Sequence, residues 1–174
     1  MSPPLWLLDD GPFGLLAGVF DAAWTWPEDT IAVVREVADS APLDKSERRD
    51  ALLKLTTVVG GQCVRIHDGG ADAAAVLWGH LRPDASKATR DLGEDASIAV
   101  CAAELPAGVF VTMDKRAAYV ALAELGRGRV CAPFELWDAL ERAGQISLET
   151  YRRLCEKTAR QDQGLSAVPR PHQR

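Results

Sequence analysis

Five carboxylates stand where the sequence predicts that a strand ends or a helix begins. Carboxylates held close together resist joint ionisation, because like charges at short range repel. A bound divalent cation removes that conflict, lowers the pKa of a bound water and stabilises charge on a phosphoryl group. A dense acidic cluster is what a Mg²⁺ or Mn²⁺ site requires. The five carboxylates are Asp9, Asp10, Glu94, Asp95 and Asp114.

Each of these carboxylates also has a purely structural interpretation. Asp9 or Asp10 would cap the first predicted helix, and Asp114 would cap the predicted helix at 115–125. Asp91 and Glu94 have the spacing of a capping box, in which Glu94 reaches back to the helix start. The sequence alone leaves both interpretations open.

The elements that would position these carboxylates alternate between strands and helices. Such alternation predicts an α/β fold, a three-layer α/β/α arrangement with a mostly parallel central sheet. Ligands bind such sheets beyond the carboxyl ends of the strands, so we expect the acidic side chains to meet there. The expected strands cover residues 5–8, 63–66, 108–112 and 129–131, with a short one at 24–27; the expected helices start near 12 and 91 and cover 31–38, 44–58, 71–81, 115–125, 134–143 and 147–159.

Length and composition restrict the class of protein. The 174 residues suit one domain, expected over 1–160, with a disordered tail at 161–174. No apolar stretch approaches the ~20 residues that cross a bilayer, and no secretory signal is recognisable, so we expect a cytoplasmic protein. The four cysteines form no CxxC pair, which argues against zinc. The net charge of −5 means that a nucleic acid would need a local basic rim.

Five motifs, in order along the chain, resemble those of PIN-like domains. The opening Leu-Asp-Asp-Gly-Pro-Phe is similar to the family's first acidic motif, and an acidic residue in the next long helix is similar to its second. The agreement in order and approximate spacing runs from about residue 5 to about residue 157. The motifs are residues 8–13, 33–36, 91–98, 111–115 and 134–146.

The resemblance implies a PIN-like fold and a metal-dependent endoribonuclease that hydrolyses RNA phosphodiester bonds. Carried over position by position, the catalytic carboxylates would be Asp9, Glu36, Glu94 and Asp114. Asp9, Glu94 and Asp114, together with Asp95, would hold one or two Mg²⁺ or Mn²⁺ ions. Asp10 would be a reserve ligand.

Basic residues beside the acidic motifs could contact an RNA substrate. Lys115, Arg116 and Arg90 could neutralise phosphates along a groove, although solvated helix ends explain them equally well. Many small proteins that resemble this chain are toxins of toxin–antitoxin pairs. We therefore expect a small antitoxin-like partner that inserts a basic side chain into the acidic cleft. The chain could also pair with a second copy of itself, and we expect no membrane partner.

The chain departs from the family pattern, and other classes stay open. Asp10 replaces the small hydroxyl residue that usually follows the first Asp, Asp114 stands without an adjacent second carboxylate, and the 71–90 region is long. One alternative is a catalytically silent PIN-like module that binds RNA or a protein. A phosphoacceptor receiver domain would use Asp9-Asp10 and Asp68, but the 41–61 insertion disfavours it. An Asp-x-Asp phosphatase is disfavoured by Gly11.

Overall fold

One parallel sheet organises the chain, and a computed structural model describes it over residues 4–19, 21, 24, 26–27, 30–39, 64–70, 72–81 and 92–161. All the paired strands of the five-stranded sheet run parallel, in the order β3-β2-β1-β4-β5. The predicted α/β fold with a parallel sheet is therefore confirmed. The strands are β1 (Trp6–Leu8), β2 (Ile31–Val34), β3 (Arg65–His67), β4 (Val109–Val111) and β5 (Val130–Cys131).

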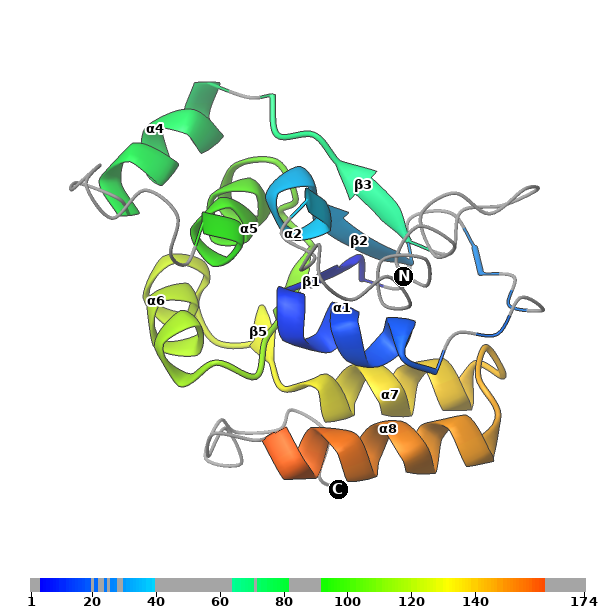
Figure 1. Cartoon of the computed structure of the whole chain (residues 1–174). Coiled ribbons are helices and arrows are strands. Elements are labelled where there is room, and N and C mark those ends of the chain that lie inside the picture. Colours follow the sequence, from blue (N-terminus) through cyan, green and yellow to red (C-terminus); the bar gives the residue numbers. More distant parts are fainter. Residues whose placement is uncertain are drawn as a thin grey trace.

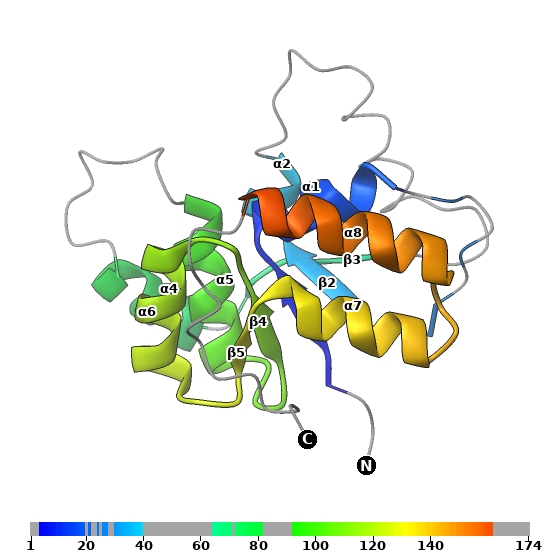
Figure 2. The same ribbon diagram turned by 90° about the horizontal axis from the view of Figure 1, so that it is seen from below.

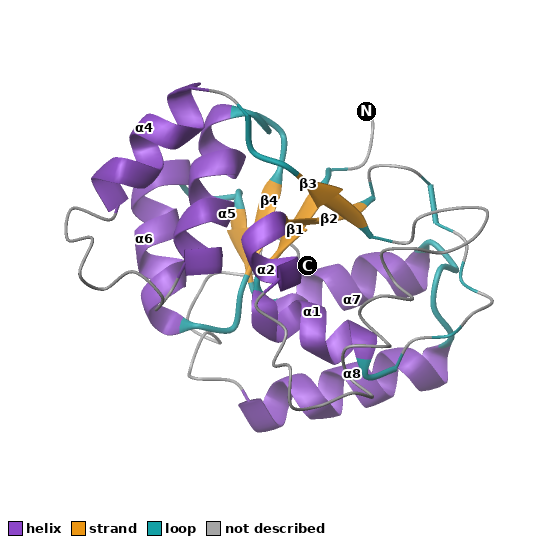
Figure 3. Cartoon of the chain, turned by 45° about the horizontal axis from the view of Figure 1, so that its top comes forward, coloured by secondary structure: helices purple, strands orange, loops and turns teal. Residues whose placement is uncertain are grey.

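Helices flank both faces of the sheet. On one face lie α1 (Asp10–Ala17), α7 (Pro133–Arg142) and α8 (Leu148–Gln161); on the other lie α4 (Asp72–Leu81), α5 (Leu92–Ala103) and α6 (Lys115–Leu125) (Figures 1 and 2). The short helix α2 (Arg35–Asp39) follows β2 directly and packs against α5. Figure 3 shows the strands enclosed between these two groups of helices. Within the described ranges, no helix is both long and apolar enough to span a bilayer.

The central strands are apolar along their whole length because both of their faces are covered. Leu7 of β1 pairs with Ala32 of β2 on one side and with Phe110 of β4 on the other, and all three are fully buried. Strands covered on both faces need no alternation of polar and apolar residues. Burial of such strands supplies most of the driving force for this fold.

The prediction of a helix at residues 31–38 was wrong in its first half. Ile31 to Val34 form the fully buried strand β2, and helix α2 begins only at Arg35. A short apolar run fits a buried strand and a buried helix equally well by periodicity. The β-branched residues Ile31, Val33 and Val34 favour the strand.

The structure does not confirm the predicted strand at 24–27. The described residues of the predicted strand at 24–27 belong to no strand; instead the rings of Trp24 and Trp26 stack with centroids 5.0 Å apart. The indole N–H of Trp26 donates to the carbonyl of Gln145 at 3.1 Å, which fastens this segment to the turn between α7 and α8. The predicted helix at 44–58 lies outside the described residues. Of the predicted tail at 161–174, only Gln161 is described, and it ends helix α8.

Candidate active site

The strand order places a topological switch point between β1 and β4. From β1 the chain moves outward to β2 and β3, and it then returns to the other side of β1 to form β4 and β5. Connections that leave two neighbouring strands in opposite directions open a crevice beyond their carboxyl ends, where open α/β sheets bind ligands. Asp9 follows β1 directly and Asp114 follows β4 closely, so both acids stand at this crevice.

Asp9 is a buried carboxylate held by two hydrogen bonds. The residue is only 5% exposed. The backbone N–H of Asp10 donates to Oδ1 at 2.7 Å, and the hydroxyl of Thr112 donates to Oδ2 at 2.7 Å. The first of these bonds caps helix α1, so the capping interpretation of Asp9 is confirmed. Because both oxygens are held, the carboxylate has a fixed orientation at the end of β1.

Burial raises the pKa of Asp9 from 3.8 to about 6, because the charged form loses contact with water. The hydrogen bonds from Thr112 and from the Asp10 backbone lower this pKa, whereas the nearby charges of Asp10 and Asp114 raise it. At neutral pH the ionised form of Asp9 therefore predominates, although burying this charge destabilises the folded protein. A buried anion next to other anions is the electrostatic setting in which a cation is bound most favourably.

Asp114 and Asp9 are joined through Thr112. The backbone N–H of Asp114 donates to the Thr112 hydroxyl oxygen at 3.0 Å, and that same hydroxyl donates to Asp9. Asp114 also caps helix α6, because its Oδ1 accepts from the backbone N–H of Ala117 at 2.9 Å. The capping interpretation of Asp114 is confirmed as well. A fully buried hydroxyl thus fixes the spacing of the two acids.

Glu94 and Asp95 form a second acidic pair, which is bound to Arg116. Nη1 of Arg116 lies 3.2 Å from Oε2 of Glu94, and Nη2 lies 3.9 Å from Oδ1 of Asp95. Asp95 is 3% exposed, so this charge is buried at the first turn of α5. Arg116 belongs to the first turn of α6, and its guanidinium joins the amino ends of the two helices. It serves there as an internal counter-ion.

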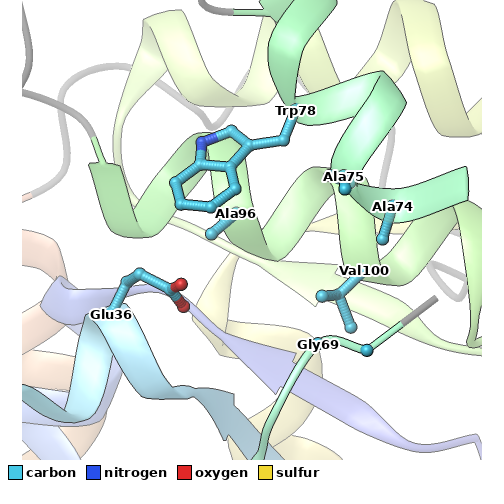
Figure 4. A pocket seen from close by; sticks show the side chains of 9 residues that line it. Glu36, Gly69, Ala74, Ala75, Trp78, Ala96 and Val100 are labelled. Carbon is cyan, nitrogen blue, oxygen red and sulfur yellow. The ribbon is translucent and has the colours of Figure 1, made fainter. Parts of the chain in front are cut away.

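Glu36 lines a pocket of 160 Å³ between α2, α4 and α5. Its carboxylate and the indole ring of Trp78 reach into the same space from different sides (Figure 4). Gly93 permits α5 to approach α2, because a Cβ at this position would lie 2.8 Å from Cγ2 of Val37. The close approach of these two helices puts Glu36 beside Ala96.

The predicted site residues therefore fall into three places. Asp9 and Asp114 are joined by Thr112, Glu94 and Asp95 are joined by Arg116, and Glu36 lines the pocket. Over the described part of the chain, no three His, Cys, Asp or Glu side chains are grouped closely enough to hold a metal ion.

Two of the three basic residues predicted to contact nucleic acid are described, and each contacts another side chain of the chain. Arg116 is engaged with the acidic pair of α5, whereas Nζ of Lys115 lies 5.9 Å from the centre of the Tyr119 ring. Arg90 lies outside the described residues.

Two further residues of the site were not predicted from the sequence. Thr112 carried a signal, since it is a polar residue ending an apolar strand two positions before an acid. No signal in the sequence pointed to Trp78, because the direction of its ring depends on the packing of α4 on α5.

Comparison with known protein families, with curated proteins and with solved structures found no match for this chain.

Proposed function

We propose that this protein is a PIN-like, divalent-metal-dependent endoribonuclease that hydrolyses RNA phosphodiester bonds at the switch point between β1 and β4. One observation carries the proposal: a buried carboxylate, Asp9, is held by two donors at the crevice where such sheets bind ligands, with a second acid, Asp114, close enough to raise its pKa. The ordered resemblance of the acidic motifs supports the same function.

In this proposal Asp9 and Asp114 would hold the metal, and Glu94 and Asp95, which Arg116 binds in this structure, would join them once Arg116 turns away. Oxygen ligands of this kind suit Mg²⁺ or Mn²⁺. When bound, such an ion lowers the pKa of a water molecule and stabilises the charge of the phosphoryl group. Thr112 keeps Asp9 oriented, and burial excludes bulk water from that carboxylate.

Arg116 has a double role in the proposed site. Without substrate it neutralises Glu94 and Asp95 across the gap between α5 and α6. Its side chain is 52% exposed, so it can turn outward to an RNA phosphate and leave the two carboxylates to the cation. Glu36 sits in the pocket and is therefore proposed to contact the substrate.

The function is tested by incubating the purified protein with single-stranded RNA. Cleavage should occur with Mn²⁺ or Mg²⁺ and stop when the metal is chelated, because the metal is proposed to activate the attacking water. The cut ends, mapped at nucleotide resolution, should be internal to the strand. Intact RNA under every metal condition would overturn the proposed function.

Replacing Arg116 by Met should strengthen the response of the fold to Mn²⁺. The variant loses the internal counter-ion of Glu94 and Asp95 but keeps an unbranched apolar stem at this position. A ligand that binds only the folded state stabilises it by mass action, so a tenfold gain in metal affinity would add about 1.4 kcal/mol at saturation, or roughly 3–6 °C. The measurement is the melting temperature with and without Mn²⁺.

The matched control is Arg152→Met, which removes an exposed arginine from α8. This variant should respond to Mn²⁺ as the wild type does. If Arg116→Met also responds like the wild type, Arg116 does not compete with a cation at this site.

A catalytically silent PIN-like module that binds RNA or a protein is the second candidate function. It is favoured by the structural partners of the acids: Asp9 and Asp114 cap helices, and Glu94 pairs with Arg116. Under either function, the small antitoxin-like partner with a basic side chain stays a prediction, as does pairing with a second copy of the chain.

A further inference from the structure

The pocket that holds Glu36 has the size of a single aromatic ring. Apart from Trp78 and Val100, its walls on α4 and α5 are built from alanines, and the turn after β3 adds two glycines; the small residues are Ala74, Ala75, Ala96, Ala99, Gly69 and Gly70. The volume is 160 Å³, close to that of an engineered cavity of about 150 Å³ that accepts benzene. It is too small for a drug-sized ligand, whose sites measure about 300–1,000 Å³.

One wall of this pocket is fixed in place by Glu104. Its Oε1 accepts from the backbone N–H of Gly70 at 3.1 Å, which ties the turn after β3 to helix α5. The turn lies so close to α5 that a Cβ at Gly69 would be 3.0 Å from Cγ2 of Val100. On the other side, Nε of Arg35 lies 2.6 Å from Oδ1 of Asp68 and links the same turn to α2. The wall that this turn contributes to the pocket is therefore preformed.

The chemistry of the pocket combines one aromatic face with one acid. Trp78 offers an indole ring, on which a nucleobase can stack. Glu36 is the only ionisable residue among the described residues that line the pocket. An ionised carboxylate only accepts hydrogen bonds, so it selects a ring that carries a donor.

These two constraints favour cytosine over the other nucleobases. Cytosine is a single ring whose exocyclic N4 amino group donates, and carboxylates accept from that group. Uracil presents the O4 acceptor at the same position, and its one ring donor used in pairing, N3–H, lies between two carbonyl acceptors that a carboxylate repels. Adenine and guanine also carry donors, but one ring matches a cavity of benzene size more closely than two fused rings do.

We propose that the pocket between α2, α4 and α5 binds a cytosine base of single-stranded RNA, stacked on Trp78 and recognised by Glu36. The proposal rests on the proposed ribonuclease function for its substrate class. It adds that cleavage occurs beside cytidines and not at random positions.

The test compares the binding of short oligocytidine and oligouridine strands, measured by fluorescence anisotropy in chelator so that no strand is cut. Wild-type protein should favour oligocytidine by about tenfold, since one good base contact discriminates by roughly 1–3 kcal/mol. Glu36→Gln should remove or reverse this preference, because the Gln amide can donate to O4 of uracil. When Mn²⁺ is added, the wild-type protein should cut beside cytidines, and Glu36→Gln should remove or reverse this preference.

Two variants of neighbouring α4 residues test the location of the base. Ala75→Leu fills the mouth of the pocket and should weaken the binding of oligocytidine by about tenfold. Val76→Leu is the matched control, since Val76 is 61% exposed and does not line the pocket. Circular dichroism should show that both variants keep the wild-type fold.

Several outcomes separate this proposal from the function on which it rests. Equal binding of the two strands, a preference for oligoadenosine, or a cytosine preference unchanged by Glu36→Gln would overturn the pocket proposal even if RNA is cut. A cytosine preference that Glu36→Gln and Ala75→Leu both abolish would support the pocket, and absence of cleavage in that case would refute only the nuclease.

Discussion

The Asp9→Asn protein should cut RNA at least ~100-fold more slowly than the wild type, because it loses the buried charge that is proposed to hold the metal. Asn has nearly the same volume as Asp and can still accept from the backbone N–H of Asp10 and contact Thr112. The variant should therefore keep the wild-type circular dichroism spectrum. Single-turnover rates in saturating Mn²⁺ measure the effect.

Glu124→Gln provides the matched control for this loss of charge. Glu124 is exposed and lies toward the far end of α6 from Asp114. Its neutralisation should leave the rate within about twofold, in keeping with the small effects of surface substitutions. Should Asp9→Asn cut RNA as fast as the control, the metal would have to be held elsewhere.

The same Asp9→Asn substitution should stabilise the fold at pH 8 by about 2–3 kcal/mol in chelator. The pKa of Asp9 is raised from 3.8 to about 6 in the folded protein, so folding favours the protonated carboxyl. Ionisation of Asp9 therefore costs folding free energy, and a shift of about two pKa units corresponds to roughly 3 kcal/mol. Asn carries no charge to bury, and functional residues often reduce stability in this way.

The sign of the pH dependence follows from the direction of the pKa shift. Well below pH 4, Asp9 is protonated in both the folded and the unfolded chain, and the substitution should have little effect. The advantage of the variant should grow between pH 4 and pH 6 and level off above pH 7. Urea unfolding of both proteins from pH 4 to pH 8 measures this difference. A variant that is less stable than the wild type at pH 8 would show that burial does not dominate at Asp9.

The positions of Asp9 and Asp114 could be predicted from the sequence because they depend on local pattern. Each follows a short apolar run that ends in an acid before a helix, and parallel strands place such positions at one edge. Ile31 to Val34 could not be assigned in the same way, since an apolar run of four residues has no decisive period. The prediction of an α/β fold was correct despite that error, because the other strands still alternate with helices.

The partners of Glu94 and Glu36 depend on packing between helices, which the sequence does not reveal. Arg116 meets Glu94 only because the amino ends of α5 and α6 lie side by side. Glu36 enters the pocket because α2 begins directly at the end of β2 and packs on α5 at Gly93. A motif therefore located these acids along the chain but not the groups that face them.

The proposed metal-dependent cleavage is tested most directly with an RNA in which sulfur replaces one non-bridging oxygen at a single cleavage site. If a metal ion at Asp9 and Asp114 contacts the scissile phosphate, cleavage of this RNA should be at least ~tenfold slower than that of normal RNA in Mg²⁺, because the hard ion prefers oxygen to sulfur. Mn²⁺, which accepts sulfur more readily, should restore the rate. Equal slowing in both metals, or cleavage that continues in chelator, would contradict a metal-dependent reaction at this site.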